Sequence, residues 1–113
     1  MTVHFFNNNI PEARFELRWG NEGHKTPSIK LSPGDMASFD LDVFSEIPDG
    51  AYCRAYACQV GTDLAKQSSI RFKYVKGRGF GGTFEFCKRL FGLGLTYYRP
   101  VNEPELSVYN ANR

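Results

Sequence analysis

The sequence has no long apolar run and no basic run of more than two residues. A membrane-spanning helix requires roughly 18 or more consecutive apolar residues, so we expect none here. The 14 Lys and Arg residues are nearly balanced by 12 Asp and Glu residues, which gives a net charge of +2. Proteins that bind nucleic acids usually carry clustered Lys and Arg that neutralise phosphates. The scattered charge therefore argues against a nucleic-acid partner.

The short motifs of common catalytic and metal sites are also missing. The sequence contains no Cys-x-x-Cys, no His-x-x-x-His and no Gly-x-Ser-x-Gly, the patterns that hold zinc or present a nucleophilic serine. The two histidines, His4 and His24, lie in different expected elements, and neither is near a candidate nucleophile in the sequence. We therefore expect a protein that is not an enzyme, with no catalytic residue, no metal and no cofactor.

Three cysteines and the N-terminal residues bear on the cellular compartment. Cys53 and Cys58 lie on one expected strand, five positions apart, so their side chains point to opposite faces. The sequence allows a disulfide between Cys87 and either of them. Three reduced thiols in a cytosolic protein are the favoured interpretation. Residues 1–7 lack the basic and apolar segments of a classical signal peptide. We expect a soluble protein that is cytoplasmic or released without such a signal.

Apolar and polar residues alternate in at least six short segments. In the clearest, Phe15, Leu17 and Trp19 share one face and three charged residues share the other. Successive side chains of a strand point to opposite faces, so this pattern predicts a sheet with one buried face. Turn residues separate these segments. The 113 residues are expected to form a single domain, an antiparallel β-sandwich of about eight strands (jelly-roll or lectin-like), with a polar tail from about residue 100.

The expected strands cover residues 2–7, 14–19, 28–31, 36–44, 51–60, 68–76, 83–88 and 95–99, with a last short strand near Val108 left open. In the segment 51–60, large and small residues alternate, which is typical of a central strand covered on both faces. The expected core consists of Phe5, Phe15, Leu17, Trp19, Phe39, Leu41, Tyr56, Ile70, Phe72, Phe84 and Phe86.

Two patterns resemble functional motifs but have simpler explanations. Gly77, Gly79 and Gly82 have the spacing of a dinucleotide-binding loop, but a strand is expected after them where that motif requires a helix. Asp40 and Asp42 project from one face of an expected strand, and paired carboxylates can act as an acid and a base. Alternating charges on a sheet are far more often its solvated face.

If successive strands run antiparallel, alternate connections lie at the same end of the sandwich. This count brings the loops 20–27, 45–50 and 77–82 together. Carboxylates, amides, a guanidinium and an aromatic ring on short turns suit the hydroxyls and the ring of a sugar. The candidate ligand-binding residues are Asn21, Glu22, His24, Glu46, Asp49, Arg78 and Phe80.

The opposite end is expected to be more basic. It would hold Asn8, Asn9, Asp63, Lys66, Lys88, Arg89 and Phe91. The segment Leu90-Phe91-Gly92-Leu93 directly follows Lys88 and Arg89. Apolar residues beside cations are suited to a membrane interface.

The order of the expected elements resembles that of small β-sandwich lectins and of aegerolysin-like membrane-binding proteins. The shared features are an Asn-rich first turn at residues 7–9, a strand that ends in Trp19-Gly20, and the turn Leu31-Ser32-Pro33-Gly34. These features cover the first third of the chain, and no site residue is carried over from either family. The resemblance implies a sandwich that binds sugars or membranes.

The leading expectation is a non-catalytic, lectin-like protein that binds a carbohydrate or glycoprotein. Single sugar sites bind weakly, so avidity of the kind seen in a haemagglutinin would require a homo-oligomer. The first alternative is a membrane-lipid-binding or pore-forming component that acts at a membrane surface. The second alternative is a structural or regulatory module that binds another protein.

Overall fold

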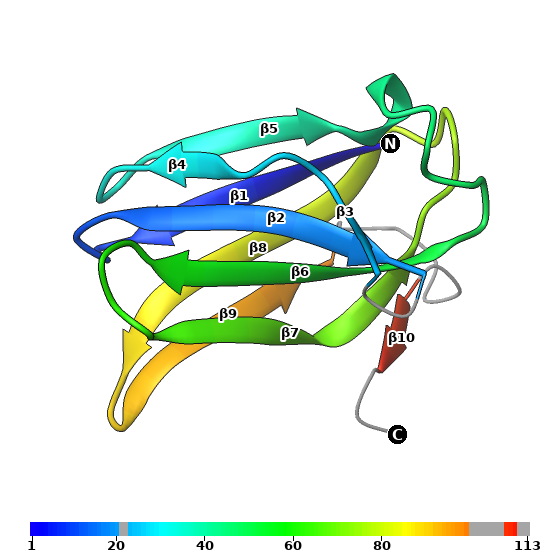
Figure 1. The fold of residues 1–113 in the computed structure, drawn as a ribbon. Coiled ribbons are helices and arrows are strands. Elements are labelled where there is room, and N and C mark those ends of the chain that lie inside the picture. The colour runs from blue at the N-terminus through cyan, green and yellow to red at the C-terminus, as the bar shows by residue number, and fades with distance from the viewer. Residues whose placement is uncertain (21–22, 100–107, 111–113) are drawn as a thin grey trace.

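The computed structural model describes residues 1–20 and 23–99, together with the backbone of residues 108–110. Two β-sheets pack face to face (Figure 1), which confirms the expected all-β, sandwich-like architecture. Sheet A contains, in spatial order, β5 (Met36–Asp40), β1 (Thr2–Asn8), β8 (Phe80–Arg89) and β9 (Gly92–Tyr98). Within the described residues, no helix is long and apolar enough to cross a membrane.

Sheet B is the larger sheet and is arranged around β2 and β6. Its spatial order is β10 (Val108–Asn110), β7 (Ala65–Lys73), β6 (Tyr52–Gln59), β2 (Ala13–Trp19) and β3 (His24–Lys25). A further short strand, β4 (Ile29–Leu31), also pairs with β2. The short strands β3 and β10 raise the number of strands above the eight expected from the sequence.

Sheet A is mixed, so the expectation of a purely antiparallel fold was wrong. β1 pairs with β5 antiparallel but with β8 parallel, in a register that sets Phe5 beside Phe84. Parallel neighbours require a long connection between them, and here six strands lie between β1 and β8 in the chain. Alternation in a sequence shows which side chains are buried, but it does not show the direction of a neighbouring strand.

Aromatic rings from both sheets form the centre of the core. Phe5 of sheet A stacks on Phe15 of sheet B with ring centroids 5.0 Å apart, and it also contacts Phe39 and Phe84 of its own sheet. All four rings are buried. Because such rings each bury a large apolar area, this cluster supplies much of the driving force that holds the two sheets together.

Two residues expected in the core, Tyr56 and Ile70, are only half-buried. In β6 the small residues Cys53, Ala55 and Ala57 face the core instead, and Tyr56 lies on the outer face of sheet B. In β7 an irregularity in pairing opposite Arg54 and Tyr56 disturbs the alternation near Ile70. The other expected core residues are buried.

The strand expected over residues 36–44 ends earlier, at Asp40. The chain then forms a short 3-10 helix, Leu41–Val43, because the carboxylate of Asp40 accepts a hydrogen bond of 3.0 Å from the backbone N–H of Asp42. Such side-chain caps compete with strand pairing. Leu41 remains buried, whereas Val43 is 70% exposed.

Candidate functional site

The loops that follow β2, β5 and β7 lie at the same end of the molecule (Figure 1). Hydrogen bonds join two of them directly. The carboxylate of Asp49 accepts from the backbone N–H of Lys76 at 3.0 Å, and the N–H of Gly50 donates to the carbonyl of Tyr74 at 2.8 Å. The predicted grouping of loops at one end is therefore present in the structure.

An open hollow of about 260 Å³ lies between the first two of these loops. We call it the loop-end hollow, and its lining residues are Trp19, His24, Lys25, Pro27, Phe44 and Glu46. It combines three aromatic rings with one ammonium and one carboxylate group. The hollow therefore offers apolar surface beside charged groups that can donate and accept hydrogen bonds.

The β2–β3 hairpin sets the aromatic wall of this hollow. Trp19 and His24 are paired across the two strands, and their rings stack with centroids 5.7 Å apart. Gly20 permits this contact: its φ is +62°, and a Cβ there would lie 2.8 Å from the Cδ2 atom of His24. Phe44 stacks on the buried ring of Phe39 at 5.0 Å, which holds the opposite wall in place.

The predicted site residues are only partly brought together. His24 and Glu46 both line the loop-end hollow. Asp49 lies in a neighbouring hollow of about 320 Å³ that shares Phe44 with the first, and its carboxylate accepts the hydrogen bond from Lys76. Phe80 instead packs against His4, with ring centroids 4.8 Å apart.

Arg78 is not among the residues that line either hollow, while Asn21 and Glu22 fall outside the described residues. Sequence reasoning did not assign Trp19, Lys25 or Phe44 to the site. It placed Trp19 wholly in the core, and the indole is indeed 7% exposed. Lys25 carried a usable signal because it follows His24 in the same loop.

A cluster of polar contacts around Asp42 lies at the neighbouring hollow, which Asp42 and Tyr74 both line. The Asp42 carboxylate accepts from the hydroxyl of Tyr74 at 2.6 Å and from the backbone N–H of Gly77 at 2.9 Å. It also forms an ion pair of 2.9 Å with the ammonium group of Met1. The Tyr74 hydroxyl, followed by this ammonium, lowers the pKa of Asp42 from 3.8 to about 2. Because these bonds join three separate segments, Asp42 has a structural role here.

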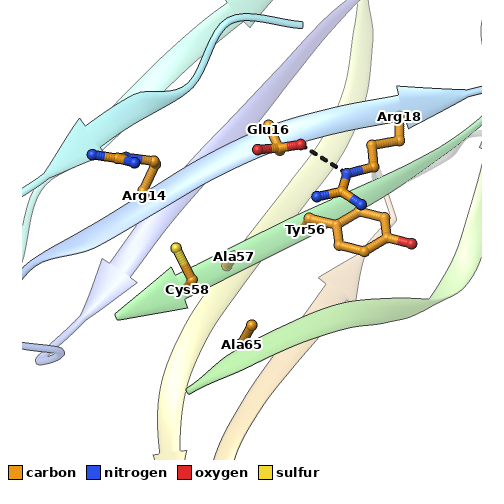
Figure 2. Close-up of a pocket in the computed structure, with 7 residues that line it drawn as sticks. All are labelled: Arg14, Glu16, Arg18, Tyr56, Ala57, Cys58 and Ala65. Carbon is orange, nitrogen blue, oxygen red and sulfur yellow. Dashed lines mark hydrogen bonds and ion pairs between the residues drawn. The ribbon is translucent and has the colours of Figure 1, made fainter. Parts of the chain in front are cut away.

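A shallow hollow on the outer face of sheet B contains a second arrangement of polar groups (Figure 2). The guanidinium of Arg18 lies 3.7 Å above the ring of Tyr56, and its Nε donates to the carboxylate of Glu16 at 2.7 Å. Arg14 and Cys58 line the same hollow further along the sheet. At about 60 Å³ the hollow is too small to enclose a ligand. Its side chains therefore form part of a nearly flat surface.

The opposite end of the molecule carries the tip of the β8–β9 hairpin (Figure 1). Leu90 and Phe91 at this tip are 88% and 91% exposed, whereas Leu93 is buried. Lys88 and Arg89 precede the tip, and Lys66 lines a hollow beside Gly92. The tip therefore presents two adjacent large apolar side chains to solvent, and it is a second candidate surface.

Comparisons with protein-family models, with curated proteins and with solved structures found no match. Any functional conclusion therefore depends on the geometry of the residues described above.

Proposed function

We propose that the protein is a non-catalytic carbohydrate-binding protein and that the loop-end hollow is its sugar site. The observation that carries this proposal is the meeting of aromatic rings with Lys25 and Glu46 in one open hollow of about 260 Å³. The rings of His24 and Phe44, which are more exposed than that of Trp19, would contact the apolar face of a sugar. The carboxylate would accept hydrogen bonds from its hydroxyls, and the ammonium would donate to its oxygens.

The walls of the hollow are held in place before any ligand arrives. Trp19 is nearly buried beneath its stacked partner His24, and Phe44 is held by Phe39. Little side-chain freedom is lost on binding when the groups are already fixed, and this lowers the entropic cost of association. A single small site still binds weakly, so we propose that several copies act together on a multivalent glycoprotein.

The test is a glycan-array screen followed by titration of each binding glycan, with the fluorescence of Trp19 as the signal. Trp19 is the only tryptophan in the chain, so a change in its emission reports on this hollow. Glu46→Gln retains the shape of the side chain but removes its charge. Gln can still accept a hydrogen bond, but a neutral bond contributes about 1–1.5 kcal/mol less than a bond to a charged group, so we expect affinity to fall on the order of tenfold.

Glu12→Gln is the matched control, because Glu12 is exposed and lies in the loop between β1 and β2 at the opposite end. It makes the same chemical change and should leave the affinity unaltered. A silent array, or equal affinities for the two variants, would contradict the proposal.

A second candidate function, binding to a membrane surface, is favoured by the exposed Leu90 and Phe91 at the β8–β9 tip. Moving a Leu or Phe side chain into apolar surroundings contributes about 1.5–3 kcal/mol. The neighbouring Lys88 and Arg89 would add attraction to anionic headgroups. Together these groups would give weak, reversible binding and not permanent anchoring.

Sedimentation with vesicles of anionic phospholipid that contain no glycolipid tests this second function. Replacing both Leu90 and Phe91 by Ser should reduce the bound fraction to the background level. Val43→Ser is the control, since Val43 is 70% exposed and lies at the other end of the molecule. An equal loss in the control, or no sedimentation of the unmodified protein, would exclude this function.

A further inference from the structure

Residues 44–46 separate the loop-end hollow from the neighbouring hollow that contains Asp49. The ring of Phe44 lines both hollows. The next two residues divide between them, because Ser45 lines the neighbouring hollow and Glu46 lines the loop-end hollow. We call these three residues the dividing segment. A chain-like ligand that crosses Phe44 would therefore reach both hollows.

Contacts within the protein hold the dividing segment in place. The backbone N–H of Phe44 donates to the carbonyl of Leu41 at 3.1 Å, and the N–H of Ile47 donates to the carbonyl of Phe44 at 3.2 Å. The side chain of Ile47 is buried in the core, and the ring of Phe44 stacks on Phe39. A ligand thus meets a surface whose shape is already set, so association costs little conformational entropy.

Each hollow offers polar groups that no other described residue uses. On one side of Phe44 these groups are the Lys25 ammonium and the Glu46 carboxylate. On the other side they are the Ser45 hydroxyl and the Lys76 ammonium. Among the described residues, none of these four side chains takes part in a hydrogen bond or an ion pair. The hydroxyl groups of a sugar can therefore be bound on both sides of Phe44.

Charge is balanced on each side of Phe44. The loop-end hollow holds one ammonium and one carboxylate group. The neighbouring hollow holds the ammonium of Lys76 and two carboxylates. One of these, that of Asp42, is already paired with the ammonium of Met1, which leaves the carboxylate of Asp49. Because a charged ligand would meet a like charge for every opposite one, this balance favours a neutral ligand.

The volumes of the hollows indicate the size of the ligand. Sites for small molecules usually have volumes of about 300–1,000 Å³. The loop-end hollow, at about 260 Å³, falls below this range, and the neighbouring hollow, at about 320 Å³, lies at its lower end. The two hollows together fall well within the range. A ligand longer than one sugar ring would fill both.

We propose that the ligand is a neutral oligosaccharide with one sugar ring on each side of Phe44. This inference rests on the proposed sugar site and specifies the class of glycan that the site takes. The ring in the loop-end hollow is bound by Lys25 and Glu46, and the next ring is bound by Ser45 and Lys76. Phe44 contacts the chain between them.

Calorimetric titration with neutral monosaccharides and disaccharides tests the inference. The panel contains glucose, galactose, mannose and N-acetylglucosamine, each with disaccharides of the same sugar in several linkages. For the sugar that binds, the best disaccharide should bind at least about tenfold more tightly than the monosaccharide, because the second ring adds hydrogen bonds at Ser45 and Lys76. Adding a sialic acid to this disaccharide should not raise the affinity.

The variant that combines Ser45→Ala with Lys76→Met removes two polar groups of the neighbouring hollow. It should lower the affinity for the disaccharide on the order of tenfold and leave the affinity for the monosaccharide unchanged. The control combines Ser32→Ala with Lys66→Met, the same changes at two exposed positions at the opposite end of the molecule. It should bind both sugars as the unmodified protein does.

Circular dichroism verifies that each variant is folded, and Lys76→Met alone replaces the double variant if the latter does not fold. Equal affinity of the unmodified protein for one and two rings would overturn the inference but leave the sugar site standing. Binding of sialylated sugars alone, or an equal loss of both affinities in the double variant, would have the same meaning. Binding of no sugar would overturn both the inference and the sugar site.

Discussion

The side-chain amide of Asn7 on β1 donates a hydrogen bond of 2.9 Å to the backbone carbonyl of Leu31 on β4, and so connects the two sheets. The same amide donates to the carbonyl of Ile10 at 2.9 Å, and its oxygen accepts from the Ile10 N–H at 2.9 Å. Asn7 is fully buried. One polar side chain therefore satisfies three backbone groups where the chain leaves sheet A for sheet B.

Asn7→Ala should lower the free energy of unfolding by about 2 kcal/mol or more, because each buried backbone group left without a partner costs about 1–3 kcal/mol. Urea denaturation measures this change. Asn8→Ala is the control, since Asn8 is exposed and its amide donates to the side-chain carboxylate of Glu85 and not to a buried backbone group. A loss of similar size in both variants would show that the buried amide contributes nothing specific.

Acid should destabilise the protein through Asp42. The folded-state pKa of this carboxyl is lowered from 3.8 to about 2, chiefly by the Tyr74 hydroxyl and the Met1 ammonium. A lowered pKa stabilises the folded state above the unfolded value of 3.8, and this contribution disappears as the pH falls towards 2. The urea midpoint should therefore decrease between these two values.

Asp42→Asn should flatten the decrease in urea midpoint and lower the midpoint at neutral pH. Asp63→Asn removes an exposed carboxylate from the β6–β7 loop and serves as the control. If Asp42→Asn retained the full dependence of the wild-type protein on pH, the ion pair would have no part in stability.

Gly82→Ala should destabilise the fold more than Gly79→Ala. Both glycines have a positive φ, +115° at Gly82 and +98° at Gly79, so both substitutions strain the backbone by about 1–3 kcal/mol. A Cβ at Gly82 would also lie 2.5 Å from the Tyr97 ring, whereas one at Gly79 has no atom within 4 Å. Tyr97 cannot move freely because its hydroxyl donates to the carbonyl of Gly81 at 2.7 Å. Equal unfolding temperatures of the two variants would contradict this explanation.

The three cysteines should differ in reactivity. All three are free thiols, and burial raises the pKa of Cys53 to about 12. Cys58 is partly exposed on the outer face of sheet B (Figure 2), so a maleimide reagent should modify it first. Cys53 should react only after unfolding. Mass spectrometry of digested samples follows each site, and Cys58→Ser should abolish the fast phase.

The buried face of a strand such as β2 could be predicted because charged and apolar residues alternate along it. In β6 the face that carries Tyr56 also carries Arg54, and this charge indicated the outer face. The prediction followed the large ring of Tyr56 instead and so placed it, rather than Ala55, in the core. The relative direction of neighbouring strands could not be predicted either. Phe5 lies beside Phe84 because β1 and β8 run parallel, and this depends on the order of strands in space.

Part of the candidate site followed from the alternation of loop ends. That argument predicted the meeting of His24 with Glu46, which the loop-end hollow confirms. It could not predict that Phe44 lines the hollow. The sequence placed Phe44 in a strand, but β5 ends at Asp40, so Phe44 lies outside the sheet.

The position of β1 between β5 and β8 has a consequence for biosynthesis. A ribosome completes β1 long before it reaches β8, the strand that pairs with Thr2 to Asn8 along one whole side. Until then the nascent chain must keep Val3 and Phe5 from aggregating with other polypeptides. Pairings between such distant segments also slow refolding.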